Sequence, residues 1–149
     1  MTKVMTLCIV CQDNKILLGI KKRGFGMGKY NGFGGKVSGN ETIEEAAKRE
    51  LLEESGLTAN NLEKLGVLDF SWEDKEGILE VNIFKVIDFS GSPTETEEMK
   101  PQWFDVDKIP FEKMWSGDKH WLPLFLENKK FKGKFIFDES NQVIEYELA

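Results

Sequence analysis

The sequence has few of the residues that mark disulfide-bonded, metal-thiolate or membrane-spanning proteins. Among 149 residues there are two cysteines, one histidine and four prolines. There is no run of 18 apolar residues, so a transmembrane helix is not expected. Residues 1–10 show no signal-peptide pattern, and we expect a cytoplasmic protein without a membrane partner.

Positive charge is also in deficit. Twenty Lys and Arg face 26 Asp and Glu, which gives a net charge of −6. This balance argues against a nucleic-acid polymer as partner, because such binding depends on a basic face. A small anionic substrate remains compatible if a metal and a few lysines offset the charge locally.

The two cysteines, Cys8 and Cys11, form a CxxC motif, which can indicate a redox or zinc site. They lie in the strand-like segment TLCIVC, where residues three apart point to opposite faces. No second cysteine pair completes a zinc site. Two reduced cysteines in a core strand are therefore the preferred interpretation.

The length fits a single domain spanning residues 1–149. Strand-like segments outnumber helix-like ones, which predicts an α+β domain with helices on the faces of a mixed or antiparallel sheet. We expect strands over 4–11, 15–20, 66–72, 78–89, 102–106, 132–138 and 143–148, helices over 43–55 and 119–128, and a polar connection over 58–65. Asp118 is the expected N-cap of the second helix.

The helix predicted over 43–55 has clear signals at both ends. Thr42 and Glu45 form a capping box, and Gly56 fits the left-handed position just past the last turn. Glu45 also has a cation four residues on, Arg49, as Glu44 has Lys48. This spacing predicts ordinary surface ion pairs.

Glu50, Glu53 and Glu54 differ from these, because they share an arc of about 100° on one side of the helix. Only Glu53 has a cation one turn away, Arg49. Three carboxylates on one face are typical of a site for a hard cation such as Mg²⁺. A solvated acidic face is the alternative, and the helix alone does not decide between the two.

Residues 21–35, KKRGFGMGKYNGFGG, contain six glycines among basic and aromatic residues. So many glycines allow the backbone to approach a ligand closely. The spacing matches neither a P-loop nor a dinucleotide fingerprint. A solvated basic loop is the alternative for this segment.

Residues 35–57 read G-x5-E-x7-R-E-L-x-E-E-x-G-L. This spacing resembles the Nudix hydrolase signature at every fixed position, a match that chance gives at roughly one start point in a billion. The similarity extends through the segments SGSPTETEEMKPQWF, IPFEKMW and KKFKGKF to the MutT-homologue branch, which removes oxidised purine nucleoside triphosphates such as 8-oxo-dGTP. It implies a mixed sheet between helices, and hydrolysis to a monophosphate and pyrophosphate that sanitises the nucleotide pool.

The resemblance also implies a divalent cation, Mg²⁺ or alternatively Mn²⁺. Its ligands would be the main-chain carbonyl of Gly34 and the carboxylates of Glu50, Glu53, Glu54 and Glu98. The catalytic residues would be Glu50, Glu53 and Glu54, with Glu53 or Glu54 as base and Arg49 orienting Glu53. The partner would be a small nucleotide, and we expect a monomer.

The substrate positions implied by the same resemblance are Thr6, Lys21, Phe25, Asn31, Phe33, Gly34, Gly35, Lys36, Phe70, Leu79, Trp115, Ser116, Gly117, Asp118 and Phe137. Trp115 would stack on the base, a contact worth about 1–3 kcal/mol. Asn31 would hydrogen-bond the purine edge, and Lys21 would lie near the phosphates or the pocket mouth.

Four departures from the family enzyme concern this pocket. Gly117 and Asp118 stand where it has two aspartates, Ser116 replaces a proline, Leu79 a methionine and Trp72 a phenylalanine. A lost buried polar contact costs on the order of 1–3 kcal/mol. We therefore expect weaker use of oxidised adenine than in the two-aspartate enzyme.

Two alternatives remain open. One is a Nudix enzyme for another nucleotide, such as ordinary dNTPs, methylated purines or a dinucleoside polyphosphate, which the change at Gly117 keeps possible. The other is a non-catalytic nucleotide-binding module on the same fold. The intact set of glutamates argues against that module.

Overall fold

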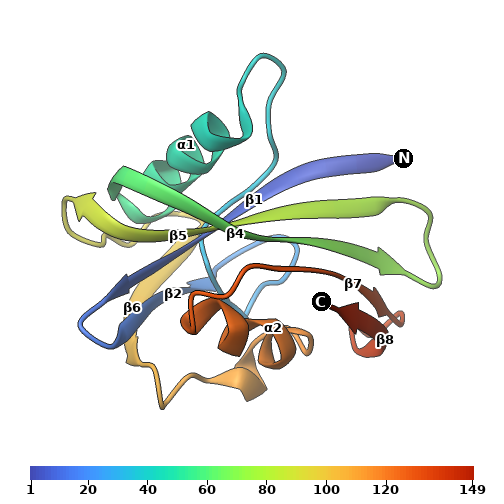
Figure 1. The fold of residues 1–149 in the computed structure, drawn as a ribbon. Coiled ribbons are helices and arrows are strands. Elements are labelled where there is room, and N and C mark those ends of the chain that lie inside the picture. Colours follow the sequence, from blue (N-terminus) through green and yellow to red (C-terminus); the bar gives the residue numbers. More distant parts are fainter.

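The computed structural model describes residues 1–149 and is built around one twisted sheet (Figure 1). In chain order the elements are β1 (Thr2–Gln12), β2 (Lys15–Lys21), β3 (Tyr30–Asn31), α1 (Ile43–Ser55), β4 (Thr58–Trp72), β5 (Ile78–Ser90), β6 (Met99–Asp105), the 3₁₀ turn η1 (Phe111–Lys113), α2 (Asp118–Leu126), β7 (Phe131–Phe137) and β8 (Val143–Leu148).

The strands follow the order β3-β2-β1-β5-β4-β7-β8, and β6 pairs with β2. Two pairs are parallel, β1 with β5 and β4 with β7, and the other pairs are antiparallel. Strands that are distant in the sequence therefore become neighbours. In particular, the parallel pairing of β4 with β7 brings the C-terminal β7–β8 hairpin beside the centre of the chain.

Each face of the sheet carries one helix and its own apolar core, as Figure 1 shows with α1 above and α2 below. On the α1 side, Ala47 and Leu51 belong to one buried cluster with residues of β1, β2 and β5. On the α2 side, Trp121 and Phe125 belong to a larger cluster with Phe135 of β7. The α+β prediction, with a mixed sheet between helices, is confirmed.

The predicted limits of α1 are correct because its signals are local. Thr42 accepts from the Glu45 backbone N–H, and the Glu45 side chain accepts from the Thr42 N–H, which completes the capping box. Gly56 has φ +78°, the left-handed conformation that glycine adopts without a steric cost.

Two structural predictions are wrong. Residues 58–65 are not a connection but the first half of β4, which pairs with β5 through several register shifts. Pairing with a neighbouring strand supplies the backbone hydrogen bonds that the polar composition did not predict. Asp118 is not an N-cap: Gly117 holds that position without a side-chain cap, and Asp118 is the first helical residue.

Cys8 and Cys11 are both free, as predicted. Cys8 is buried in the α1-side cluster, while Cys11 packs against the α2-side cluster. Their side chains therefore point to opposite faces of β1, which excludes a disulfide or a shared metal between them.

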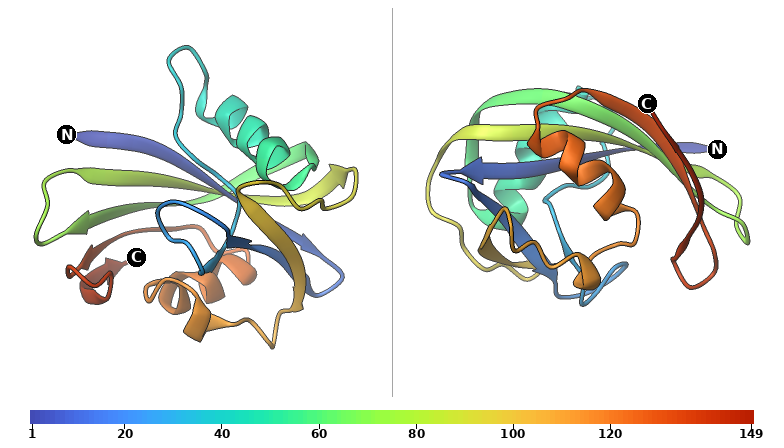
Figure 2. Two further views of the ribbon diagram at one scale, coloured as in Figure 1. Left: turned by 180° about the vertical axis from the view of Figure 1, so that it is seen from behind. Right: turned by 60° about the horizontal axis from the view of Figure 1, so that its bottom comes forward.

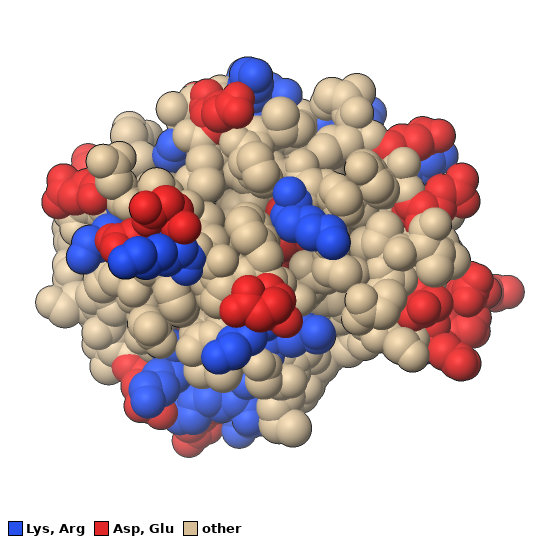
Figure 3. All heavy atoms as spheres, turned by 90° about the horizontal axis from the view of Figure 1, so that it is seen from below, with Lys and Arg blue, Asp and Glu red and all other residues tan.

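Neither helix is long and apolar enough to cross a lipid bilayer. On the α2 side of the molecule, seen from below in Figure 3, most basic side chains lie at the centre and lower left beside acidic ones, while a group at the right-hand edge is acidic only.

Candidate active site

The segment after β3 runs along β1 and brings glycine backbone against both β1 and α1. The backbone N–H of Thr6 donates to the Gly35 carbonyl at 2.8 Å, and Phe33 and Cys8 exchange two such bonds. A Cβ at Gly34 would overlap the Thr6 carbonyl, and one at Gly35 would lie 2.6 Å from the Glu50 carboxyl carbon. Only glycine at these positions lets the loop reach the acidic face of the helix.

Glu54 is the most enclosed carboxylate of that face, with 6% of its surface exposed. Its Oε1 accepts a hydrogen bond from the Gly34 N–H at 2.9 Å. Burial raises the pKa of Glu54 to about 7, and the Gly34 N–H and the Lys21 charge only partly oppose this effect. The protein thus holds an ionisable oxygen donor in a site that does not by itself favour the charged form.

Arg49 connects three other carboxylates of the signature. Its guanidinium donates to Glu41 at 2.6 and 3.0 Å, to Glu50 at 2.9 Å and to Glu53 at 3.2 Å. Hydrogen bonds to these carboxylates, above all Glu41, raise the pKa of Arg49, so it remains charged. The geometry lets Arg49 position Glu53, as expected from the sequence, and Glu50, which was not expected.

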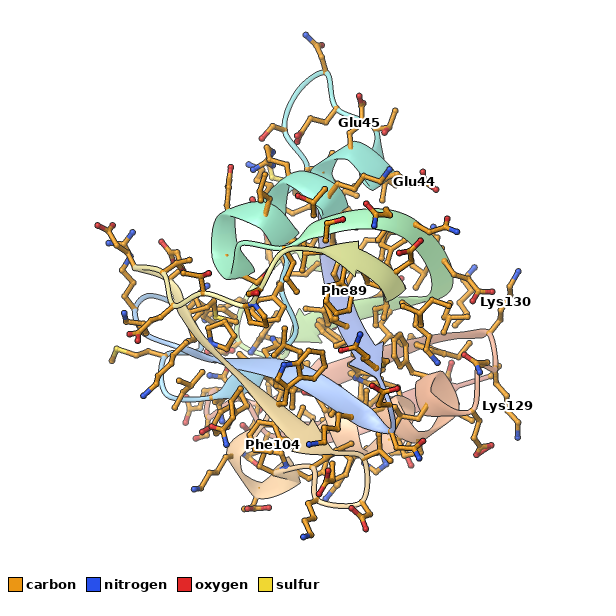
Figure 4. The ribbon with its side chains drawn as sticks, turned by 90° about the vertical axis from the view of Figure 1, so that its left-hand side faces the viewer. Glu44, Glu45, Phe89, Phe104, Lys129 and Lys130 are labelled. Atoms are coloured by element: carbon orange, nitrogen blue, oxygen red, sulfur yellow. The ribbon has the colours of Figure 1, made fainter.

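The predicted pairing of Arg49 with Glu45 is wrong, because the Glu45 side chain is used in the capping box. Nor does Glu44 form the predicted ion pair with Lys48. In Figure 4 Glu44 and Glu45 extend outward from the first turn of α1.

Glu98 lies in the loop before β6 and pairs with Arg23 of the glycine-rich segment at 2.7 Å. The hydrogen bond from Arg23 lowers the pKa of Glu98. A second pair, Lys22 with Glu95 at 2.7 Å, joins the same two segments. The two ion pairs connect the glycine-rich segment to the acidic loop. The positive charge of Lys21, in the same segment, acts to lower the pKa of both Glu54 and Glu98.

The predicted metal ligands are not assembled into one cluster: no group of three or more Asp, Glu, His or Cys side chains is placed to hold a metal ion. Glu50 and Glu53 contact Arg49, Glu98 contacts Arg23, and Gly34 presents its N–H, not its carbonyl, to Glu54. The donor chemistry nevertheless fits a hard divalent cation, since all these side chains offer carboxylate oxygens. The glycine backbone at Gly35 also leaves the room beside Glu50 that a Cβ would fill.

A cavity of about 160 Å³ opens from this acidic face toward α2. At about 10–15 Å³ for each water-sized group, it has room for on the order of ten non-hydrogen atoms, the size of a purine ring system. Its walls include the aromatic residues Phe25, Phe70, Trp72, Trp115, Trp121 and Phe137. Phe25 and Trp115 lie 5.1 Å apart between ring centres, and the Lys29 ammonium lies over the Trp115 ring at 5.6 Å.

Two polar side chains, Asp118 and Asn31, line the cavity together with its aromatic residues. Asp118 is 4% exposed, and its Oδ1 accepts from the indole N–H of Trp121 at 3.1 Å, while its buried Oδ2 has no partner. Asn31 accepts from the Gly32 N–H at 2.8 Å through Oδ1, which leaves its amide N–H groups for a ligand. A planar base could therefore meet an amide donor and a carboxyl oxygen at its edge.

Eleven of the fifteen predicted substrate positions line this cavity: Thr6, Lys21, Phe25, Asn31, Gly34, Gly35, Phe70, Leu79, Trp115, Asp118 and Phe137. Four do not. Phe33 has its side chain fully buried in the α1-side core. Lys36 is exposed, and Ser116 and Gly117 lie behind the wall, toward β8.

Several residues that shape the site were not among the predicted ones. Lys29 lines the cavity, Glu41 accepts hydrogen bonds from Arg49, and Arg23 donates to Glu98. Glu41 occupies a fixed position of the signature, which could have indicated its role. The contacts of Lys29 and Arg23 depend on long-range packing that no local pattern reveals.

Comparisons with known proteins agree with this geometry. Residues 1–125 match the model of the NUDIX domain. The oxidized purine nucleoside triphosphate hydrolase of Danio rerio is 51% identical over 147 residues, covering 99% of this chain and 94% of that protein, and the one of Mus musculus is 49% identical with the same coverage. A MutT protein from Bacillus halodurans superimposes with a TM-score of 0.88 at 27% identity, covering 98% of this chain and 97% of that one.

Proposed function

Because the chain belongs to the Nudix hydrolase family, we propose that it hydrolyses oxidised purine nucleoside triphosphates, such as 8-oxo-dGTP, to the monophosphate and pyrophosphate. Two relatives that match nearly the whole chain are named oxidized purine nucleoside triphosphate hydrolases. In a cell the reaction would sanitise the nucleotide pool and prevent DNA damage.

The observation that supports the proposal best is the continuity of the cavity. Its lining includes Asp118 of α2 and aromatic residues of the α2-side core, and also Gly34, Gly35 and Glu54, which meet at α1. A base bound against the aromatic residues would direct its phosphates toward the acidic face of α1 and toward Lys21. Base recognition and phosphate chemistry are thus separate parts of one site.

Nudix hydrolases generally use divalent metal ions, and we propose Mg²⁺, with Mn²⁺ as a substitute. The residues that would hold it are Glu50, Glu53, Glu54, Glu98 and the Gly34 carbonyl. Bound there, the ion would offset the charge of the phosphate groups and of the carboxylates.

The chain's own groups have distinct tasks in the proposed reaction. A water molecule attacks the β-phosphorus, the bond from that phosphorus to the α–β bridging oxygen breaks, the monophosphate leaves with this oxygen, and Glu53 or Glu54 takes the proton of the water. Arg49 holds Glu50 and Glu53 in place. Lys21 contacts the phosphates, and Trp115 stacks on the base.

We expect wild-type protein with Mg²⁺ to hydrolyse 8-oxo-dGTP at a higher kcat/KM than dGTP, and oxidised adenine nucleotides more slowly than 8-oxo-dGTP. The reason is that Asp118 supplies a single carboxylate beside the aromatic lining of the cavity, and glycine at position 117 has no side chain to supply a second one. The measurement is a panel of 8-oxo-dGTP, 2-hydroxy-dATP, 8-oxo-dATP, O6-methyl-dGTP and the four normal dNTPs, with products separated.

Pyrophosphate as product agrees with cleavage between the β-phosphorus and the oxygen that bridges it to the α-phosphorus, whereas orthophosphate contradicts that cleavage. Equal kcat/KM for 8-oxo-dGTP and dGTP would overturn the sanitation role and favour a Nudix enzyme for another nucleotide. No metal-dependent turnover of any nucleotide in the panel would favour a non-catalytic binding module.

We expect the substitution Arg23→Gln to increase the affinity of nucleotide-free protein for Mn²⁺ about two- to fivefold, because the guanidinium then no longer competes for Glu98. The measurement is a Mn²⁺ titration followed by electron paramagnetic resonance. Lys22→Gln is the matched control, since it removes the same charge and an ion pair between the same two segments, but its partner Glu95 is outside the proposed ligand set. Equal effects of the two substitutions would contradict a specific role of Glu98.

Two further parts of the proposal rest on the sequence. We propose a monomer that acts on a small nucleotide and not on a nucleic-acid polymer, and we propose that it works in the cytoplasm. Size-exclusion chromatography with light scattering tests the first, and imaging of the tagged protein tests the second.

A further inference from the structure

The C-terminal β7–β8 hairpin lies beside α2 in both views of Figure 2. Two side-chain hydrogen bonds join this hairpin to the base-binding end of the cavity. The indole N–H of Trp72 donates to Asn141 Oδ1 at 2.7 Å, and the backbone N–H of Val143 donates to Ser116 Oγ at 2.9 Å. Asn141 lies in the turn of the hairpin, and Trp72 lines the cavity.

The hairpin also packs closely against the first turn of α2, which carries Asp118. A Cβ at Gly117 would lie 3.0 Å from the Phe135 ring, so the glycine permits this close approach. The His120 ring stacks on Tyr146 of β8 at 4.2 Å between ring centres. The hairpin therefore covers the outer side of the helix turn whose inner side faces the cavity.

Trp72 is the link between the hairpin and the aromatic wall. Its ring stacks on Phe137 at 5.2 Å and meets Phe25 and Trp115 edge to face at 5.9 and 6.4 Å. The indole N–H at the far edge of the same ring bonds Asn141. Fixing that N–H fixes the rotation of the ring, and with it the surface that Phe25 and Trp115 contact.

We propose that Asn141 is a positioning residue for base binding: it orients Trp72, and through Trp72 it sets the aromatic wall against which the base stacks. Ser116 fastens the same hairpin at a second point. The proposal rests on the proposed function only for the identity of the base. The acidic face of α1 is at the other end of the cavity, so Asn141 affects KM and not kcat.

The test is Asn141→Gly, which removes the amide but tolerates the positive φ of +62° at this position. We expect KM for 8-oxo-dGTP to rise about three- to tenfold, the range for one lost hydrogen bond, with kcat unchanged. Asn14→Gly is the matched control: it is an exposed asparagine with φ +60° in the turn between β1 and β2. Asn141→Asp keeps an acceptor for the indole and is expected to restore the wild-type KM.

Trp72→Phe removes the same hydrogen bond from the other side. In the Asn141→Gly background we expect this substitution to raise KM less than it does alone, because the two residues act as one unit. Additive effects on KM would overturn the proposal. The proposal would also be overturned if Asn141→Gly and Asn14→Gly had the same KM. A lower stability of Asn141→Gly in urea would then show that Asn141 has only a structural role.

Failure of the proposed function is distinguishable from failure of this inference. If wild-type protein prefers another nucleotide to 8-oxo-dGTP, the function is revised, and the same variants are compared on the preferred nucleotide. If KM rises in Asn141→Gly but not in the control Asn14→Gly, and Asn141→Asp has the wild-type KM, the inference is supported whichever base is bound.

Discussion

Replacing Glu54 or Glu53 with glutamine is expected to lower kcat by about 10²–10⁴-fold while the protein remains folded. Each substitution replaces a charged oxygen pair with a neutral amide, so the side chain can neither accept a proton from water nor offset a cation. The fold should persist because a glutamine Oε1 at position 54 can still accept from the Gly34 N–H. At position 53 the side chain is more than half exposed, so the change is solvated.

The measurements are kcat with 8-oxo-dGTP and the urea midpoint of each variant. Glu44→Gln is the matched control, because Glu44 lies on the same helix, is exposed in the first turn and extends away from the site (Figure 4). It should retain wild-type kcat. Full turnover of either test variant would remove that residue's catalytic role, and an equal loss in Glu44→Gln would mean that helix charge alone is responsible.

The limits of α1 were predictable because their causes lie within a few residues. The Thr42 and Glu45 capping box and the left-handed Gly56 are local, and the structure contains both. The acidic face was equally predictable, since helical periodicity alone places Glu50, Glu53 and Glu54 together. What the periodicity could not show is that Arg49 reaches Glu50 and the more distant Glu41 as well as Glu53.

The elements that sequence reasoning missed are those that depend on a distant partner. The polar residues 58–65 form a strand only because β5 lies beside them. Phe33 was expected to be a substrate position from the resemblance, yet the pairing of its segment with β1 places its ring in the α1-side core. The hydrogen bond between Trp72 and Asn141 spans 69 positions, and it exists because β4 pairs with β7.

The change of Asp118 to asparagine is expected to remove a pH dependence from both stability and base binding. Burial raises the pKa of Asp118 to about 7, although the Trp121 hydrogen bond and the Lys29 charge oppose the rise. In the unfolded chain the pKa of this carboxyl is the ordinary aspartate value of 3.8, so between about pH 4 and pH 7 the folded state holds more protons. Stability from this group therefore falls as pH rises through that window, and it changes little above pH 7.

Asparagine cannot ionise, so the free energy of unfolding of Asp118→Asn should lack this slope. Relative to wild type, the variant should gain about 1.4 kcal/mol for each pH unit crossed within the window. Urea unfolding at pH 5 and pH 8 measures the difference, with Asp74→Asn, an exposed aspartate in the β4–β5 turn, as the control. The same stability difference from wild type at both pH values would show that Asp118 is ionised throughout.

Base binding should reveal the same titration. An ionised Asp118 only accepts hydrogen bonds, which suits the N–H groups at the edge of 8-oxoguanine, so the wild-type KM for 8-oxo-dGTP should fall as pH rises through 7. Titration of the nucleotide phosphates affects wild type and variant alike, so it cancels in the ratio of the Asp118→Asn KM to the wild-type KM. A ratio that is constant from pH 6 to pH 8.5 would contradict the titration. A ratio that rises toward high pH, because only the wild-type KM improves, would identify the unpartnered Oδ2 of Asp118 as the group that reads the base.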